Sequence, residues 1–336
     1  MPAVQKQFEE FHDAIKLDED DEKAKLREKR EMLIDALKAN LPDDVPAFTP
    51  FNQGSYSMST GVVPLDGNYD IDVGLVFDCT KDHYPDLIAL KQKVRDSLDT
   101  LGRTVLIRRP CVTVNYMRNG SPAYHVDLAI YVKRNDDLLD LAKGKENSAA
   151  EHKVWEMSDP KKLTKVICEA FSEAKDLAQY RRCIRYIKRW RDFQFCNGGA
   201  PLSIALTVAA KMWFKPKFEP SGKPADLRAL LDWVNSILIN FVGTTTSEGN
   251  HKRLRVDLPV SPHSDLLKGM TKLQMEVFQE KLEYLRNALG EAYDEDLPED
   301  ACNLLKKQLG DDFKVPEKSQ TAKAAVAPVI STGNSA

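Results

Sequence analysis

The sequence predicts an α+β fold in two lobes, a strand-containing lobe over residues 45–150 and a helix bundle over residues 151–316. Segments rich in Val, Ile, Tyr and Phe are concentrated between residues 45 and 132, which is typical of strands in a partly covered sheet. Beyond residue 133 this pattern fades and apolar residues recur at helical spacing. The length of 336 residues agrees with two lobes of ordinary domain size.

The N-terminal segment, residues 1–44, is predicted to form a helix. An acidic run at residues 18–22 precedes a stretch in which Leu26, Leu33 and Leu37 recur at helical spacing, and acidic residues before basic ones suit the helix dipole. We expect one long helix that braces the lobes and ends near Asn40. The acidic run itself is interpreted as a solvated face.

The strand-containing lobe is expected to carry strands over residues 73–77, 104–107, 111–116 and 124–132, with a helix over residues 85–101. Residues 142–150 are interpreted as a linker, because they contain Gly144, Asn147 and Ser148.

The second lobe is predicted to be helical throughout. Asp159-Pro160 indicates a helix start, and Gly290 is interpreted as a helix stop. Trp155, Trp213 and Trp233 are expected in the core of this lobe, and residues 317–336 are expected to form a flexible tail. The predicted helices cover residues 161–176, 177–195, 201–213, 226–241, 265–289 and 299–309.

Composition excludes several classes of function. Hydrophobic residues make up 42% of the chain and charged residues 29%, with no stretch near the roughly 20 apolar residues that cross a bilayer. The N-terminus lacks a secretory signal, so we expect a cytoplasmic protein with no membrane partner. The net charge of −3 argues against stable DNA or RNA binding. Six cysteines and six histidines without ligand spacing predict neither a zinc site nor disulfides.

Two aspartates stand at the start of an apolar strand. Asp70 and Asp72 are two residues apart, so in a strand both carboxylates lie on one face, while Ile71 and Val73 point to the other. Two such carboxylates repel each other and are costly to bury without a cation. A divalent ion would remove that objection, since Mg²⁺ binds carboxylate oxygens together with substrate phosphates.

A third carboxylate lies in a later strand. Asp127 stands between apolar residues of the predicted strand 124–132, and a two-ion site commonly draws on an acid from a neighbouring strand. The alternative is a half-exposed aspartate beside Arg108 or Arg109, and the residues leave both open.

A Gly-Ser pair precedes these acids. Gly54 allows close approach of the backbone to a phosphate, and Ser55 adds a hydroxyl near free N–H groups. Alone, the pair would indicate an ordinary turn. Its combination with the three aspartates favours a phosphate site.

Together these motifs resemble the signature of nucleotidyltransferases related to DNA polymerase beta. Fourteen residues separate Gly54-Ser55 from Asp70-Ile71-Asp72-Val73, about one more than the usual range. The fuller form, which adds Gln53, Thr60 and Pro64, is similar to the bacterial cGAS/DncV-like nucleotidyltransferases (CD-NTases) of the CBASS antiphage system. The resemblance extends to residues 308–315, which are similar to the family's Phe-Gly-x-x-Phe ending, with Leu309 in place of the first Phe.

The resemblance implies a polymerase-beta-like lobe with a mixed β-sheet, followed by a helix-bundle lobe. It also implies that Asp70, Asp72 and Asp127 are catalytic and hold two Mg²⁺ ions, for which Mn²⁺ can substitute, and that Asp127 helps to deprotonate the attacking ribose hydroxyl. The residues that would bind the nucleotide are Gln53, Gly54, Ser55, Lys188 and Ser203.

Lys188 is also notable on the residues alone. In a helix over residues 180–191 it forms a basic strip with Arg181 and Arg185, along the edge of an apolar stripe. A basic strip is usually solvated; opposite three aspartates we interpret it as binding a triphosphate. Tyr56, Tyr69 and Tyr116 are interpreted as packing residues, with stacking on a base as the alternative.

We therefore predict an enzyme that condenses ribonucleoside triphosphates, ATP with GTP or UTP as alternatives, into a cyclic di- or trinucleotide and releases pyrophosphate. The resemblance adds a separate effector that responds to the product, and conjugation of the C-terminus by a ubiquitin-like machinery. One alternative is a linear, template-independent RNA or tRNA nucleotidyltransferase. The other is a catalytically idle nucleotide-binding partner protein.

Overall fold

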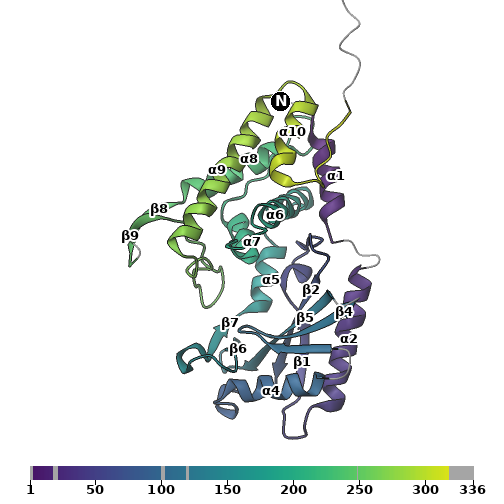
Figure 1. The fold of residues 1–336 in the computed structure, drawn as a ribbon, viewed down its shortest axis with the longest axis vertical. Helices are drawn as coiled ribbons and strands as arrows, with labels where there is room; N and C mark the ends of the chain where they lie inside the picture. Colours follow the sequence, from purple (N-terminus) through teal and green to yellow (C-terminus); the bar gives the residue numbers. More distant parts are fainter. Residues whose placement is uncertain (1–2, 18–21, 100–102, 119–120, 248, 318–336) are drawn as a thin grey trace, which may run out of the picture.

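The structure is a computed structural model that describes residues 3–17, 22–99, 103–118, 121–247 and 249–317. It has two lobes, one built around a sheet and one mostly helical (Figure 1). The first lobe contains α2 (Glu22–Asn40), β1 (Phe48–Asn52), α3 (Gly54–Ser57), β2 (Tyr69–Phe77), η1 (Lys81–His83), α4 (Leu87–Leu98), β3 (Arg103–Ile107), β4 (Val112–Arg118), β5 (Ser121–Lys133), β6 (Leu139–Lys143), η2 (Ala150–His152) and β7 (Val154–Ser158).

The sheet is mixed, as predicted. Strand order is β1-β2-β5-β4-β3, with β6 and β7 added beside the far end of β5. β2 and β5 run parallel, whereas the other strand pairs are antiparallel. The long central strand β5 thus contacts three neighbours, which places it where residues from several segments meet.

The two faces of the sheet differ. Alternate residues of β2 and β5, including Ile71, Val73 and Val126, pack with α2 and α4 in one apolar core. This covering explains the strand's apolar run, because side chains alternate between faces. The residues between them face the helical lobe, and Asp70, Asp72 and Asp127 are among these.

The single N-terminal helix is a prediction that the structure corrects. The first helix, α1 (Gln5–Ile15), ends where Lys16 turns to an extended conformation, and α2 begins separately at Glu22. Phe8 and Phe11 of α1 belong to the core of the helical lobe, whereas Leu26, Leu33 and Leu37 of α2 belong to the core of the first lobe. Each helix follows the lobe that buries its apolar stripe.

The region after residue 133 contains more strand than predicted. Residues 139–143 form β6, partly within the expected linker, and β7 lies in the segment expected to be helical. Trp155 of β7 packs against the core of the first lobe and donates its indole N–H to the carbonyl of Tyr84 at 2.9 Å, so its placement in the helical core was wrong. These strands are short, and they are stabilised by pairing within the sheet, which an alternation of apolar residues in the sequence does not reveal.

The second lobe is a helix bundle with one hairpin. Gly290 does not end its helix, because α9 continues to Asp294. The hairpin was not predicted; its exposed, polar strands lack the alternation that marks a buried face. The elements are α5 (Pro160–Cys168), α6 (Ala174–Gln194), α7 (Ser203–Trp213), α8 (Asp226–Ile239), β8 (Val242–Thr246), β9 (Gly249–Arg253), α9 (Lys272–Asp294) and α10 (Pro298–Leu309).

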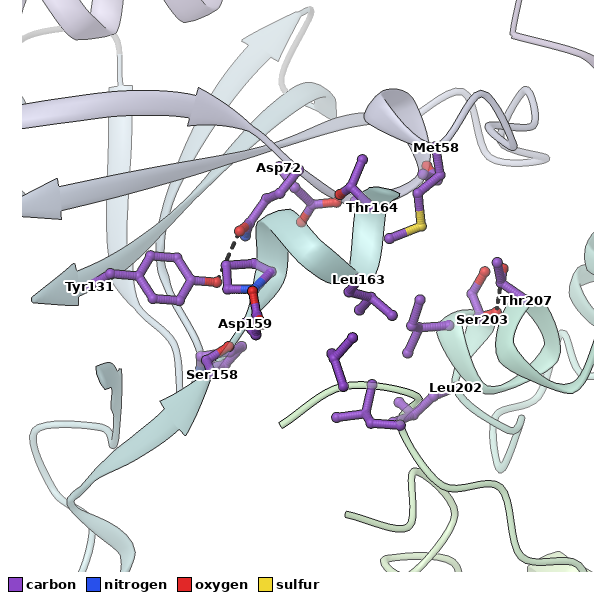
Figure 2. A pocket seen from close by; sticks show the side chains of 18 of the residues that line it. Met58, Asp72, Tyr131, Ser158, Asp159, Leu163, Thr164, Leu202, Ser203 and Thr207 are labelled. Atoms are coloured by element: carbon purple, nitrogen blue, oxygen red, sulfur yellow. Dashed lines mark hydrogen bonds between the residues drawn. The ribbon is translucent and has the colours of Figure 1, made fainter. Parts of the chain in front are cut away.

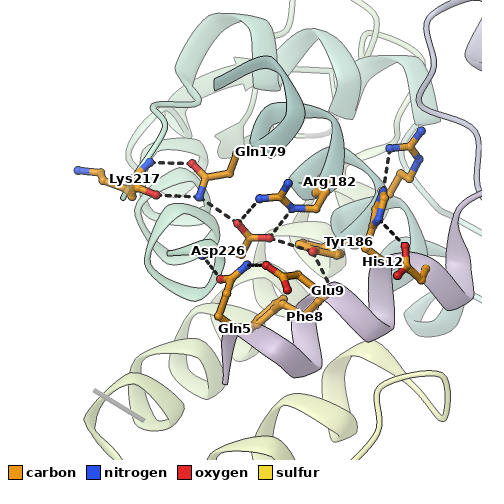
Figure 3. Close-up of polar contacts among 11 residues, drawn as sticks. Gln5, Phe8, Glu9, His12, Gln179, Arg182, Tyr186, Lys217 and Asp226 are labelled. Atoms are coloured by element: carbon orange, nitrogen blue, oxygen red, sulfur yellow. Dashed lines mark hydrogen bonds and ion pairs between the residues drawn. The ribbon is translucent and has the colours of Figure 1, made fainter. Parts of the chain in front are cut away.

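A buried polar network fixes α1 within this lobe (Figure 3). The fully buried carboxylate of Asp226 accepts two hydrogen bonds from Arg182, at 2.7 and 2.9 Å, and further bonds from Gln179 and Tyr186. The amide N–H of Asp226 donates to the side chain of Gln5 at 2.9 Å. The buried charge is thus paired and satisfied, as burial requires.

Within the described ranges, none of the helices combines the length and the apolar character that a bilayer crossing requires. The tail predicted for residues 317–336 lies, from residue 318, outside the described residues.

Candidate active site

The parallel register of β2 and β5 brings the three predicted acids together. Asp72 is the register partner of Asp127, and Asp70 lies two residues earlier on the same face of β2. Because side chains on paired residues of adjacent strands point the same way, the three acids lie on one face of the sheet.

Burial raises the pKa of two of these carboxyl groups, those of Asp72 and Asp70. Loss of solvent, followed by the charges of Asp70 and Asp127, raises the pKa of Asp72 to about 7, although the charge of Lys188 lowers it. Burial also raises the pKa of Asp70; His125 and Lys188 lower it, and Asp127 raises it. Such shifts arise where acids are crowded in a low-dielectric site, and they mark candidate functional groups.

Asp127 differs from the other two acids in its contacts. Its Oδ1 accepts a hydrogen bond of 2.5 Å from Thr113, its register partner in β4. As the side chains lie, no three acidic, His or Cys residues within the described part of the chain are grouped closely enough to hold a metal ion. Their donor chemistry nevertheless fits a divalent cation. Asp70 and Asp72 are desolvated carboxylates that repel each other, and Asp127 keeps one oxygen that Thr113 does not contact.

The turn that begins at Gly54 lies against Asp72. Gly54 has a φ of +71°, and a Cβ there would sit 1.9 Å from Oδ2 of Asp72, so only glycine allows this approach. The backbone N–H of Gln53 donates to the backbone carbonyl of Asp72 at 3.2 Å. The side-chain Oε1 of Gln53 accepts a hydrogen bond of 2.9 Å from the hydroxyl of Tyr131. Hydrogen bonds to β2 and to β5 therefore hold the turn beside the acids.

The helical lobe contributes Lys188 from α6 and Ser203 from the first turn of α7. Lys188 is almost fully buried, and burial, followed by the charge of Arg185, lowers its pKa to about 7. Its Nζ donates to the carbonyl and to Oγ1 of Thr60, both at 3.1 Å. An ammonium group from one lobe is thereby held against a loop of the other.

The predicted basic strip on α6 is divided. Lys188 lines the cavity, but Arg185 donates to the carbonyls of Gly61 and Ser59, and Arg181 is not among the lining residues. The neighbouring Arg189 donates to the carbonyl of Val63. The interpretation of the whole strip as a triphosphate site is wrong for Arg185, because its guanidinium fastens the loop that follows α3.

One cavity of about 570 Å³ joins these parts (Figure 2). Asp72 and Tyr131 enter from the sheet, Leu163 and Thr164 from α5, and Ser203 and Thr207 from α7. Asp127 is not a lining residue, since it is turned toward Thr113. The predicted site residues that line the cavity are Gln53, Gly54, Ser55, Asp70, Asp72, Lys188 and Ser203.

Several lining residues escaped the sequence analysis. Tyr131 follows Asp127 by four positions and so lies on the same strand face, a signal that alternation alone would have provided. Ser158 and Asp159 reach the cavity only because β7 joins the sheet. Leu258 and Val260 come from an irregular segment that no local pattern identifies.

The three tyrosines considered for base stacking do not line the cavity. Tyr69 stacks on Tyr124, with ring centroids 5.7 Å apart, and Tyr116 packs against the core of the first lobe. Tyr56 accepts a hydrogen bond from Arg27 at 2.6 Å. Their interpretation as packing residues agrees with these contacts.

The chain resembles known proteins in sequence and in fold. Residues 47–131 match the family described as cyclic GMP-AMP synthase DncV-like, nucleotidyltransferase domain. A cyclic GMP-AMP synthase of Escherichia albertii is 29% identical over 199 residues, which cover 55% of this chain. The chain thus spans 42% of that relative's length.

Three solved structures illustrate the similarity in fold. The CD-NTase CdnG of Bradyrhizobium diazoefficiens, in complex with GTP, is 16% identical and has a TM-score of 0.69. The similar region covers 92% of this chain and 96% of the CdnG chain. CdnC of E. coli MS115-1 with ATP has a TM-score of 0.63 at 18% identity, covering 92% and 98%. Apo DncV of Vibrio cholerae has a TM-score of 0.59 at 19% identity, covering 92% and 86%. At these identities the likeness concerns the fold.

Proposed function

We propose that this chain is a nucleotidyltransferase of the cGAS/DncV family and that it joins ribonucleoside triphosphates into a cyclic di- or trinucleotide. The observation that carries the proposal is the shared cavity. It brings a glycine turn, two desolvated aspartates and a buried lysine from two lobes around one space, and this is the combination that phosphoryl transfer uses for positioning and charge neutralisation.

Binding of the triphosphate would involve groups from both lobes. The Gly54 turn allows phosphate oxygens to approach its backbone, and Ser55 adds a hydroxyl. Lys188 supplies a positive charge from α6, and Ser203 a hydroxyl from the first turn of α7. Gln53 is oriented by Tyr131, so that its amide faces the same cavity.

Asp70, Asp72 and Asp127 would hold Mg²⁺, or Mn²⁺ in its place. When bound there, Mg²⁺ supplies positive charge to the triphosphate and to the attacking hydroxyl. The chain's own part in the reaction is proton transfer, in which Asp127, once its side chain turns from Thr113 toward the cavity, takes the proton of the ribose hydroxyl. The hydroxyl oxygen then bonds to the α-phosphorus. The bond between the α-phosphorus and the oxygen that bridges it to the β-phosphorus breaks, and pyrophosphate leaves with that oxygen.

ATP is the expected substrate, with GTP or UTP as alternatives. The wall opposite the acids is aliphatic, with Leu163, Leu202, Leu258 and Val260. Such a wall packs against the faces of a purine or a pyrimidine alike and does not distinguish them through hydrogen bonds.

The experiment is incubation with the four labelled ribonucleoside triphosphates and Mg²⁺, followed by phosphatase and mass spectrometry. A phosphatase-resistant product without a terminal phosphate is expected, and the double variant Asp70→Asn/Asp72→Asn should make none. Linear products would instead support a template-independent RNA or tRNA nucleotidyltransferase. Binding of triphosphates with no product, equal in parent and variant, would support a catalytically idle nucleotide-binding protein.

The biological setting stays a prediction from the resemblance. It comprises antiphage defence in the cytoplasm, a separate effector that responds to the product, and conjugation of the C-terminus by a ubiquitin-like machinery. Intact-mass analysis in the presence of the conjugating enzymes tests the last of these.

A further inference from the structure

Thr60 lies where the loop that follows α3 meets the helical lobe. Its side chain is fully buried, and its backbone N–H donates to the carbonyl of Ser55 at 3.0 Å. Thr60 therefore closes the turn that begins at Gly54, but it is not a lining residue of the cavity. A role for its hydroxyl must act through a neighbour.

That neighbour is Lys188. An ammonium group has three N–H donors. Within the described part of the chain, the hydrogen bonds found for Nζ of Lys188 are the two to Thr60, one to the carbonyl and one to Oγ1, each 3.1 Å long. Since Lys188 also lines the cavity, its third donor remains for a ligand there. Two fixed bonds on a tetrahedral nitrogen determine the direction of the third.

The fold fixes the loop independently of this contact. Arg185 donates to the carbonyls of Ser59 and Gly61, at 2.7 and 3.1 Å, and Arg189 donates to the carbonyl of Val63 at 2.9 Å. On the opposite side, the backbone N–H of Leu17 donates to the carbonyl of Gly61 at 3.3 Å. The Thr60 hydroxyl is thus presented to Lys188 by a loop that other residues hold in place.

We propose that Thr60 is a positioning residue that directs the ammonium group of Lys188 toward the triphosphate. The proposal rests on the proposed function, because it assumes that Lys188 binds phosphate. It extends that function to a residue that does not touch the substrate. The hydroxyl is the part that matters, since the backbone carbonyl is present whatever residue occupies the position.

The test compares Thr60→Val, which keeps the shape and removes the hydroxyl, with Thr60→Ser, which restores it. Binding of a non-hydrolysable ATP analogue and of adenosine is measured by calorimetry in the presence of Mg²⁺, so that the readout does not depend on turnover. Thr60→Val should bind the analogue about ten-fold more weakly, as expected for the loss of one hydrogen bond to a charged group. Adenosine affinity should stay the same, and Thr60→Ser should bind the analogue like the parent.

Two further variants complete the design. Lys188→Met should weaken analogue binding on its own, and adding Thr60→Val to it should cause no further loss, because the two residues act as a unit. Ser97→Ala is the matched control, because it removes another buried hydroxyl. This hydroxyl donates to the carbonyls of Asn40 and Lys93, and none of these three residues lines the cavity. Its affinity for the analogue should equal that of the parent.

The outcomes are distinct. Normal analogue binding by Thr60→Val beside weakened binding by Lys188→Met overturns this inference and leaves the proposed function intact. Normal binding by Lys188→Met removes Lys188 from the proposed phosphate site and also overturns the inference, whereas the proposed function itself is decided by the product assay. Equal losses of analogue and adenosine binding in Thr60→Val, together with a lower melting temperature, indicate a structural role and also overturn the inference.

Discussion

Asp72 of β2 stands opposite Asp127 of β5 in the parallel register of the central strands. Their side chains share the sheet face that carries Asp70, while Val73 and Leu128 on the other face are buried against α2 and α4. The apolar face holds both strands rigidly, and the polar face concentrates negative charge at one place.

The charge of Asp72 should make stability depend on pH in the metal-free protein. Its pKa of about 7 in the folded protein exceeds the unfolded value of about 3.9. Between these values the folded state binds more protons than the unfolded chain, so the free energy of unfolding falls as pH rises from about 4 to about 7. Urea denaturation in EDTA at several pH values measures this fall, which should be on the order of a few kcal/mol.

The variant Asp72→Asn should lose most of this fall and be more stable than the parent at pH 8. Asp35→Asn provides the control, because the Asp35 side chain is 74% exposed on α2 and should leave the pH dependence unchanged. An Asp72→Asn profile parallel to that of the parent would contradict the assignment.

Gly54 should tolerate no side chain. Gly54→Ala would place a Cβ 1.9 Å from Oδ2 of Asp72 at a φ of +71°, so we expect a loss of activity of about 10²-fold through displacement of the aspartate. Gly67→Ala is a matched control, since Gly67 has the same φ of +71° with no atom within 4 Å of its Cβ position. It should cost only about 1–2 kcal/mol of stability from the backbone strain. Equal activities of the two variants would refute the close-approach argument.

Thr113 should orient Asp127, the third of the proposed metal ligands. Its hydroxyl donates to Oδ1 of Asp127 at 2.5 Å, and removal of such a partner typically weakens metal binding by about 10- to 100-fold. We expect Thr113→Val to bind Mg²⁺ about ten-fold more weakly in calorimetry, with Thr113→Ser close to the parent. Mg²⁺ should raise the melting temperature of the parent, and Asp70→Asn/Asp72→Asn should abolish this rise. Unchanged Mg²⁺ affinity in Thr113→Val would show that Asp127 needs no such support.

The Asp226 network should account for much of the stability of the helical lobe. Asp226→Ala removes the fully buried carboxylate that pairs with Arg182, whose side chain is 16% exposed, so we expect a loss of about 3–5 kcal/mol in the free energy of unfolding. Asp232→Ala, on the same helix, removes the exposed partner of Lys217 and should cost less than about 1 kcal/mol. Chemical denaturation of both variants measures the difference. Similar losses would mean that burial of the Asp226 pair is not what stabilises the lobe.

Much of the site could be predicted from the sequence because its signals are local. The spacing of Asp70 and Asp72 places both on one strand face, and the alternation of β5 does the same for Asp127. The glycine requirement at position 54 also follows from a local turn, although the structure supplied its cause, the carboxylate of Asp72. In contrast, β6 and β7 were missed because sheet pairing, not composition, makes them strands.

By itself the sequence determined the class of fold, the acids and the Gly-Ser turn, since these depend on residue type and on spacing along single segments. Only the tertiary structure decided that α1 and α2 separate to serve different lobes, because burial of each apolar stripe depends on distant partners. It also decided which basic side chain of α6 faces the cavity. Lys188 and Arg185 lie on one helix edge, but Arg185 donates to loop carbonyls of the other lobe, a contact made across more than a hundred residues of chain.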